Sequence, residues 1–264
     1  MKLARQGKIS FFQPDWAADA GIQAGFTTRN GGVSRAPFNS LNLGTNTEDQ
    51  AYSVEGNRST FSRAFGLQPR HLLTCSQVHG MDVLMVNEPN LDLSHFQRVE
   101  ADAIITNQRG VMAGILVADC YPVILFDAQN QASAVVHVGW QGAAGGILGK
   151  TIGCMTREFG TDPSALAVAV GPGIGAHNYE VDRPVRDAFE KGTGNWRQIA
   201  SEKDLGKWQL DLQLSCRLQL EAAGIPERNC RLVSECTCCH KELFFSYRRD
   251  KGVTGRQMGF VLMP

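Results

Sequence analysis

The sequence lacks long apolar runs, and it lacks an excess of charge of either sign. No run of apolar residues approaches the roughly 18 that a membrane-spanning helix needs, so no membrane partner is expected. Lys and Arg total 26 and Asp and Glu total 26, which leaves no formal net charge. Proteins that bind nucleic acid are typically basic, so this balance argues against that class, although a local basic pocket for a small anion stays open.

The chain also lacks an N-terminal signal of the secretory kind. Residues 1–5 have no apolar core like that of a signal peptide, and we therefore expect a cytoplasmic protein. A reducing compartment keeps thiols free, so the eight cysteines are not expected to form disulfides. Such cysteines are candidates for packing, for metal binding or for nucleophilic chemistry.

No Pro- or Ser-rich linker, repeat or low-complexity tract interrupts the 264 residues, so a single domain over 1–264 is the simplest organisation. Apolar runs that suit both faces of a covered sheet alternate with helical patterns, which predicts an α/β fold. Strands are expected at 9–12, 22–26, 72–78, 103–106, 114–118, 123–127, 134–138, 165–170, 244–247 and 258–262, and helices at 49–65, 143–159, 183–191 and 210–223.

Several glycine-rich and charged segments are candidates for anion binding. Residues 171–175, Gly-Pro-Gly-Ile-Gly, are not followed by the Lys of a phosphate-binding Walker loop, which indicates a tight turn. The polar loops 27–34 and 39–44 suit hairpin turns, or a backbone cradle for an anion beside Arg29. Residues 248–250, Arg-Arg-Asp, suit a charged edge, or a pocket in which one guanidinium binds phosphate while the other pairs with the aspartate.

A dense group of sulfur ligands, Cys-Thr-Cys-Cys-His, occupies residues 236–240. Its density suggests a metal, yet closed structural sites usually use two separated pairs of ligands. The adjacent Cys238 and Cys239 are also hard to aim at one ion from a regular strand. A metal site formed by Cys236, Cys238, Cys239 and His240 and plain packing both stay open.

The strongest candidate centre is spread over three segments. His79 precedes Gly80 at the end of an apolar run, Cys120 stands in what reads as an apolar strand, and His137 lies within another apolar run. Each residue alone is typical of packing, and their spacing matches no short zinc signature. Together, two imidazoles and one thiolate can form a three-ligand zinc site with an open fourth position.

The segments that contain these residues resemble the multicopper polyphenol oxidase (laccase-like) family, also described as the purine nucleoside phosphorylase family of the bacterial YfiH and YlmD type. The resemblance extends over nearly the whole chain, in pieces that follow the same order. The pieces are residues 26–34, 40–44, 57–58, 77–80, 118–122, 137–140, 171–175, 179–181, 244–250 and 254–256.

The resemblance implies a layered α/β/β/α single domain with mixed sheets, similar in core to the deamidating cytotoxic necrotizing toxins. It implies that His79, Cys120 and His137 bind one zinc ion, with copper as an older assignment for the family. It implies phosphorolysis of adenosine, inosine, guanosine and methylthioadenosine, and deamination of adenosine. The implied partners are purine nucleosides and phosphate, and a monomer is expected.

Residues in the matching pieces receive roles on the same basis. Cys120 and His137 are assigned to catalysis, and Asp119 is a candidate proton shuttle because it is adjacent to Cys120. The residues assigned to substrate binding are Arg29, Asn42, Gln77 and Arg248.

Two positions depart from the family pattern. Gln141 stands where the family commonly has Arg after Gly-Trp, and His177 with Asn178 replaces a frequent Cys pair, so substrate preference is expected to differ if either position touches substrate. Other functions stay open: a copper polyphenol oxidase, for which two His and one Cys are few ligands; a metal-free hydrolase with Cys120 as nucleophile and His137 as base; a hydrolase that edits peptidoglycan precursors; and a non-catalytic binding protein.

Overall fold

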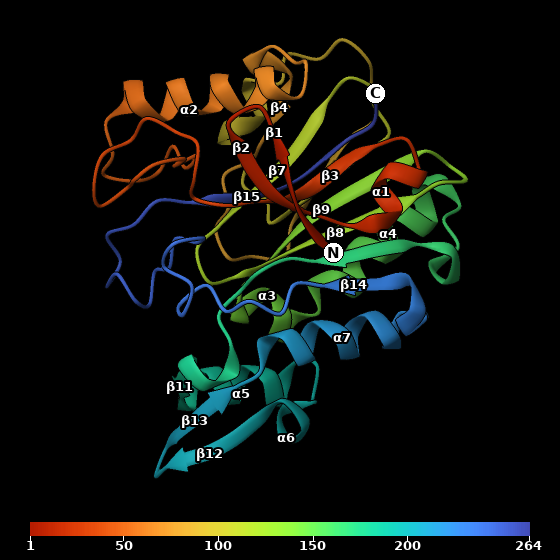
Figure 1. The fold of residues 1–264 in the computed structure, drawn as a ribbon. Coiled ribbons are helices and arrows are strands. Elements are labelled where there is room, and N and C mark those ends of the chain that lie inside the picture. Colours follow the sequence, from red (N-terminus) through yellow and green to blue (C-terminus); the bar gives the residue numbers. More distant parts are fainter.

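The computed structural model describes residues 1–264 and contains two six-stranded mixed sheets (Figure 1). In order across the first sheet, its strands are β1 (Lys2–Gln6), β2 (Ile9–Gln13), β3 (Gln23–Thr27), β15 (Gln257–Leu262), β7 (Met112–Val117) and β4 (Leu72–Leu73). In order across the second sheet, they are β14 (Cys230–Leu232), β10 (Ala167–Val170), β8 (Tyr121–Asp127), β9 (Ala132–Val138), β6 (Ala103–Thr106) and β5 (Val83–Val86).

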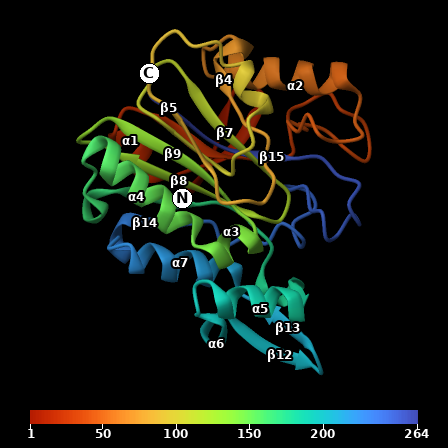
Figure 2. The same cartoon turned by 180° about the vertical axis from the view of Figure 1, so that it is seen from behind.

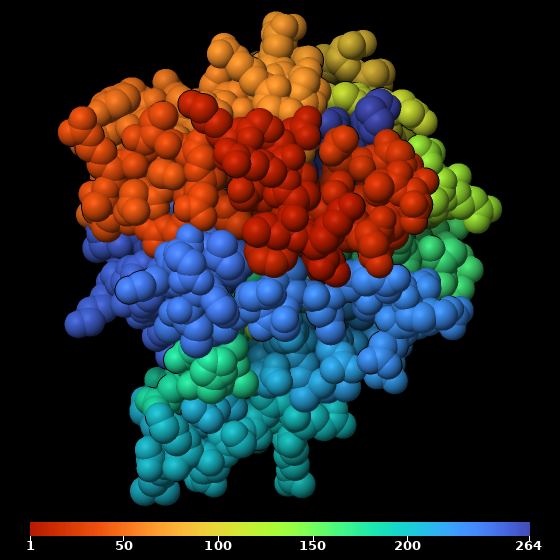
Figure 3. Space-filling model, in the orientation of Figure 1, coloured from red at the N-terminus to blue at the C-terminus, as the bar shows by residue number.

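A third, small sheet projects from one end of the molecule, as the space-filling view shows (Figure 3). Its strands are β11 (Glu180–Asp182), β13 (Lys207–Leu210) and β12 (Ala200–Asp204). The helices are α1 (Asp15–Asp19), α2 (Ala51–Ala64), α3 (Trp140–Gly145), α4 (Ile147–Phe159), α5 (Arg183–Lys191), α6 (Trp196–Ile199) and α7 (Leu212–Ala222). None of them has the length and apolar character needed to cross a bilayer.

The two large sheets pack face to face because β8 and β9 are apolar on both faces. Ile124 and Val135 pack between the sheets against Phe26 of β3. Their neighbours Val123 and Val136 point the other way, toward the helices, because successive side chains of a strand alternate between faces. Both faces of this sheet are therefore covered, and its strands have no polar side to expose.

Helices close the two outer faces. Phe61 of α2 packs edge-on against Phe260 of β15, with ring centroids 5.2 Å apart. On the opposite side, Ile147, Ile152 and Met155 form the buried face of α4, and α3 and α7 lie beside it in the view from behind (Figure 2). The order of layers is helix, sheet, sheet, helix, which confirms the expected α/β/β/α architecture.

Three expected elements differ in the structure. The single helix expected at 143–159 is two helices, because Gly146 adopts a left-handed conformation (φ 79°) that ends α3 and starts α4. The strand expected at 72–78 is reduced to Leu72 and Leu73, followed by one isolated β-bridge between Ser76 and Glu100. The strand expected at 244–247 is wrong: Phe245 is buried in irregular backbone, and the side-chain amide of Gln257 bonds both its N–H and its carbonyl in place of a neighbouring strand.

Candidate metal centre and active-site cavity

The register of the second sheet brings Cys120, His137 and Asp102 to one edge. The strands β8 and β9 form an antiparallel pair in which Tyr121 lies opposite Val138 and Pro122 opposite His137, so Cys120 lies beside the end of β9. Asp102 immediately precedes β6, and its carbonyl accepts the N–H of His137 at 2.7 Å. Residues far apart in the sequence are therefore neighbours at this edge.

Cys120 lies in a tight bend between β7 and β8, and the expectation that it stands within a strand is wrong. The residue before it, Asp119, has a φ of 92°, and His79 has a φ of 58°. Left-handed backbone is uncommon for residues with a side chain and is concentrated at functional sites. Both bends turn a candidate ligand out of its apolar segment and toward the other two.

The three candidate ligands meet at this point. One donor atom each from His79, Cys120 and His137 lies within 4.8 Å of the other two. The imidazole rings are 4.7 Å apart between centroids and nearly perpendicular. Gly139 makes room for them, because a Cβ at that position would lie 2.8 Å from Nδ1 of His79 and 3.2 Å from Sγ of Cys120.

Asp102, which belongs to none of the sequence motifs, connects the two histidines. Its Oδ1 accepts a hydrogen bond from Nδ1 of His137 at 2.6 Å and another from the backbone N–H of His79 at 3.0 Å. Its Oδ2 accepts the N–H groups of Gly80 at 2.6 Å and Val78 at 3.3 Å. A fully buried carboxylate thus fixes the tautomer of one ligand and the backbone of the other, as outer-sphere partners of metal ligands commonly do.

The electrostatics of the centre favour a thiolate. Burial raises the pKa of the Cys120 thiol, but the imidazoles of His137 and His79 outweigh burial and bring the pKa to about 6. Burial opposes a charge on His137, yet the Cys120 thiolate and the Asp102 carboxylate raise its pKa to about 9. A thiolate and imidazoles close enough to share one ion are a donor set that zinc prefers, so these residues fit the metal that the resemblance implies.

The centre lines a cavity of about 690 Å³, a size typical of small-molecule sites. The His79 side chain is exposed, whereas His137 is 3% exposed and lies within β9. Aromatic and cationic side chains also line the cavity. They are Trp140, Tyr179, Tyr247, Arg248 and Arg256.

Three of the other assigned residues line this cavity. Both amide atoms of Gln77 bond the backbone of Leu116, each at 2.8 Å. Arg248 donates to the carbonyl of Glu180 at 3.0 Å, and its guanidinium lies 5.3 Å from the centroid of the Tyr179 ring. Asp119 accepts hydrogen bonds at both carboxylate oxygens, from the Thr237 hydroxyl at 2.6 Å and from the N–H of Arg248 at 2.7 Å.

Arg29 and Asn42 lie outside the set of residues that line the cavity. The guanidinium of Arg29 donates to the carbonyls of Asn39 and Lys241 and stacks on Phe245, with 4.5 Å to the ring centroid. The buried amide of Asn42 instead accepts the N–H of Arg256 at 2.9 Å. These side chains bind other parts of the protein, so neither residue is included in the substrate-binding set proposed below.

Arg256 lines the cavity and was missing from the assigned set, although residues 254–256 belong to one of the motifs. Burial lowers the pKa of its guanidinium, and the nearby Cys120 partly offsets this effect. Its Nη1 donates to the carbonyls of Thr254 and Gly255, while Nε and Nη2 make no hydrogen bond to the protein. Gln141 also lines the cavity.

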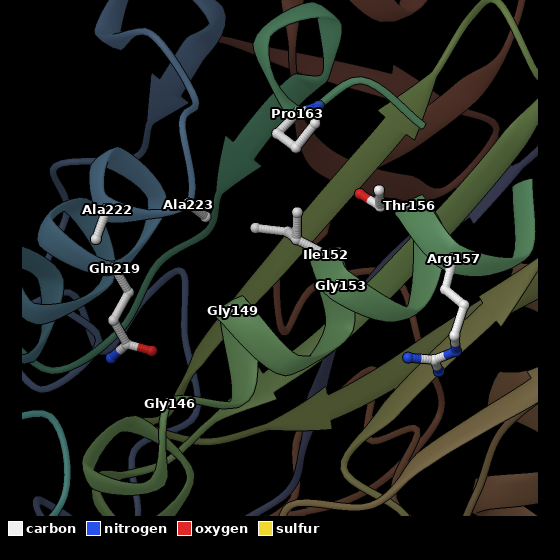
Figure 4. A pocket seen from close by; sticks show the side chains of 10 residues that line it. All are labelled: Gly146, Gly149, Ile152, Gly153, Thr156, Arg157, Pro163, Gln219, Ala222 and Ala223. Carbon is white, nitrogen blue, oxygen red and sulfur yellow. The ribbon is translucent and has the colours of Figure 1, made fainter. Parts of the chain in front are cut away.

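A second cavity, of about 480 Å³, lies between α4 and α7 (Figure 4). It is lined mainly by small and apolar residues such as Gly149, Gly153 and Ala222, with Arg157 at one side. It contains no His, Cys, Asp or Glu that could serve as nucleophile, base or metal ligand. Of these two cavities, only the larger is lined by residues that could act as nucleophile, base or metal ligand.

The sulfur-rich segment 236–240 does not converge as a unit. Cys236 and Cys239 lie close to His177, which comes from the segment after β10. His240 instead pairs with Glu242 at 3.1 Å. The four-residue site considered from the sequence is thus replaced by a different grouping.

The fold and the centre together define a class: a mixed α/β protein with a His–Cys–His candidate metal centre in an aromatic- and arginine-lined cavity. A family model described as multi-copper polyphenol oxidoreductase laccase matches residues 23–264, so the chain belongs to this family. The resemblance inferred from the motifs is thereby confirmed.

Relatives cover nearly the whole chain. Purine nucleoside phosphorylase YlmD of Geobacillus stearothermophilus is 34% identical over 251 residues, which are 92% of this chain and 90% of the relative. A purine nucleoside phosphorylase of Corynebacterium glutamicum is 37% identical over 241 residues, covering 90% and 93%. The crystal structure of the Bacillus licheniformis hypothetical protein YfiH superposes with a TM-score of 0.91 at 30% identity, covering 97% of each chain.

Proposed function

We propose that this protein is a zinc-dependent purine nucleoside phosphorylase that acts on adenosine, inosine, guanosine and methylthioadenosine, and that it also deaminates adenosine. One observation carries the proposal: the His79, Cys120 and His137 donor atoms converge in a cavity that also presents two arginines and three aromatic rings. The names of the relatives favour the same reaction.

Phosphorolysis places phosphate against C1′ of the ribose; a phosphate oxygen bonds to C1′ while the bond from C1′ to the base breaks. The chain must therefore hold an anion beside the sugar, and Arg248 and Arg256 are the cations that line the cavity. Guanidinium groups match phosphate oxygens in geometry and charge. Each guanidinium uses Nη1 for two backbone carbonyls and leaves Nε and Nη2 for a ligand. Arg256 is the stronger candidate because it is less exposed than Arg248, and charges attract more strongly where water is excluded.

The rings of Trp140, Tyr179 and Tyr247 are the surfaces on which a purine base can stack. Aromatic faces bind bases with little regard to their exocyclic groups, and this suits the breadth of purine nucleosides expected as substrates. Tyr247 is 56% exposed and Tyr179 is half-buried, so the two rings lie at different depths in the cavity. Gln141 is exposed at the same cavity and is placed to discriminate among bases or sugars.

When bound, zinc supplies a Lewis acid that polarises an oxygen of substrate or water. His79, Cys120 and His137 would hold the ion, and Asp102 keeps Nδ1 of His137 protonated so that Nε2 is free for it. Asp119 joins the Cys120 bend to the Thr237 hydroxyl and to the backbone N–H of Arg248, and we assign it a positioning role. Its expected role as a proton shuttle stays a prediction.

A metal-free cysteine hydrolase is the second candidate, and one observation favours it. Asp102, His137 and Cys120 form a chain in which a buried carboxylate orients the imidazole that lies beside the thiolate. This arrangement resembles the catalytic triad of thiol hydrolases, in which an orienting group holds the base beside the nucleophile. Such an enzyme would withstand a chelator and lose activity on thiol alkylation.

The test is an assay of inosine with inorganic phosphate, with hypoxanthine and ribose 1-phosphate measured by chromatography. Adenosine is assayed in parallel, because adenine reports phosphorolysis and inosine reports deamination. We expect phosphate-dependent release of the base, lost on treatment with a zinc chelator and restored by zinc. Base release that is independent of phosphate, or that is unaffected by the chelator, would contradict the proposal.

A further inference from the structure

Outside the active-site cavity, the segments after β10 and β14 bring an imidazole and two thiols together. Nε2 of His177 lies 3.2 Å from Sγ of Cys239, and one donor atom each from His177, Cys236 and Cys239 lies within 4.8 Å of the other two. Zinc bonds of about 2.0–2.3 Å in tetrahedral geometry place ligand atoms about 3.6–3.8 Å apart. The three side chains are therefore spaced to share one ion.

The backbone around the sulfurs also fits a metal-binding turn. Cys236 and Cys239 are separated by two residues, and the N–H groups of Cys239 and His240 both donate to the carbonyl of Cys236, at 3.2 and 3.1 Å. This Cys-x-x-Cys turn supplies half of many zinc sites. The N–H of Gly175 donates to Sγ of Cys236 at 3.1 Å, and such donors stabilise the thiolate form that binds metal.

Two further contacts show that the segments are packed closely at this point. The side-chain amide of Asn178 donates to both sulfurs, at 3.5 Å for Cys236 and 3.1 Å for Cys239. A Cβ at Gly175 would lie 2.8 Å from the His177 ring and 3.3 Å from Cβ of Cys236. The sulfurs thus receive directed donors from the segment that carries the imidazole.

We propose that His177, Cys236 and Cys239 form a second zinc site, separate from the centre in the cavity, with the fourth position taken by water. Two thiolates and an imidazole select a thiophilic cation over calcium or magnesium. Neither Cys238 nor His240 is a ligand of this site. Zinc binding at this site does not depend on which reaction takes place in the cavity.

The position of the site gives it a structural consequence for the cavity. Thr237, next to Cys236, donates to Asp119, which precedes Cys120. The carbonyl of Asn178, next to His177, accepts a hydrogen bond from Arg248 at 3.4 Å. An ion at this site would tie together the two segments, drawn in teal and blue in Figure 1, that position Asp119 and Arg248 at the cavity.

The experiment is the zinc content per chain of the full-length protein, purified with a reductant and without chelator, by inductively coupled plasma mass spectrometry. We expect two zinc ions in the wild type and one in the double variant Cys236→Ser, Cys239→Ser. Cys238→Ser is the matched control, because it removes a thiol from the same turn, and it should keep both ions. The proposal is overturned if the double variant binds as much zinc as the wild type, or if Cys238→Ser loses the same equivalent.

Two further measurements cover the case in which the double variant does not fold. The variant His177→Gln leaves both sulfurs in place and should lose the same zinc equivalent. In Cys120→Ala, which disables the first centre, bound Co²⁺ should show thiolate charge-transfer absorption that disappears when Cys239→Ser is added. A Cys236–Cys239 disulfide, detected as two fewer reactive thiols in denaturant, together with a single zinc per chain would refute the second site.

Discussion

Asp102→Asn tests how the candidate centre is held together. The carboxylate accepts four hydrogen bonds, from the His137 ring and from the backbone N–H groups of Val78, His79 and Gly80. An asparagine keeps one acceptor oxygen and replaces the other with an NH₂ group, which would face N–H donors. Two of the four bonds are therefore lost, whichever way the amide turns.

The size of the effect follows from these contacts. Each hydrogen bond to a charged group contributes about 1.5–3 kcal/mol, so the free energy of unfolding should fall by about 3–6 kcal/mol. Loss of an outer-sphere partner typically weakens metal binding by about 10–100-fold. Zinc affinity should therefore fall by about 1.4–2.8 kcal/mol in binding free energy.

The assay is competition for zinc against a chromophoric chelator, with circular dichroism to establish that the variant is folded. Asp82→Asn is the matched control, because it makes the same charge change near His79 at a carboxylate that is 80% exposed and pairs only with Lys150. The control should bind zinc like the wild type. Unchanged zinc affinity in folded Asp102→Asn would refute the role assigned to this carboxylate.

Three other substitutions follow from the geometry. Gly139→Ala should weaken zinc binding, because the added Cβ would lie 2.8 Å from the His79 imidazole; chelator competition measures the loss. Arg256→Met should raise KM for phosphate by about tenfold, which is about 1.4 kcal/mol, with a smaller change in KM for the nucleoside; steady-state kinetics separate the two. Burial raises the pKa of Asp250, but hydrogen bonds from Arg249 outweigh it and lower the pKa. Asp250→Asn should therefore cost about 1 kcal/mol at neutral pH, a difference that disappears in denaturant titrations as the pH falls below about 4.

Matched controls make each result specific. Gly149→Ala changes a helical glycine with open space around it and should leave zinc binding intact. Arg157→Met removes an exposed arginine of α4 and should leave both KM values unchanged. A stability difference for Asp250→Asn that persists at low pH would show that the lost interaction is not that of the ionised carboxylate.

The sequence predicted the central elements of the fold well. The apolar runs of β8, β9 and β10 and the amphipathic faces of α2 and α4 depend on local periodicity, which a sequence displays directly. The strand expected at 244–247 failed because Phe244 and Phe245 are buried by tertiary contacts in irregular backbone, and their apolar character is the same in either conformation. The small sheet of β11, β12 and β13 was missed because its strands have three to five residues and at most one buried residue each.

The sequence singled out the three candidate ligands that converge in the structure, but not the carboxylate that supports them. His79, Cys120 and His137 belong to motifs that can be read along the chain, and the structure brings them together. Asp102 was missed, although a lone carboxylate just before the apolar run of β6 was the available signal. Its role depends on strand register, which places it opposite His137.

The grouping of the remaining cysteines could not be read from the sequence either. His177 and the pair Cys236 and Cys239 come from segments that meet only because β10 and β14 are parallel neighbours. The close spacing of cysteine and histidine along the chain favoured residues 236–240 as one metal site. The fold instead brings only Cys236 and Cys239 of that segment to His177. The expected cytoplasmic location and monomeric state stay predictions.

The most direct test of the central claim is to measure zinc content and phosphorolysis together in the wild type and in Cys120→Ala. The account predicts that the variant folds, contains one zinc ion fewer per chain than the wild type, and releases no base from inosine and phosphate. A folded Cys120→Ala protein with the wild-type zinc content and full turnover would contradict it.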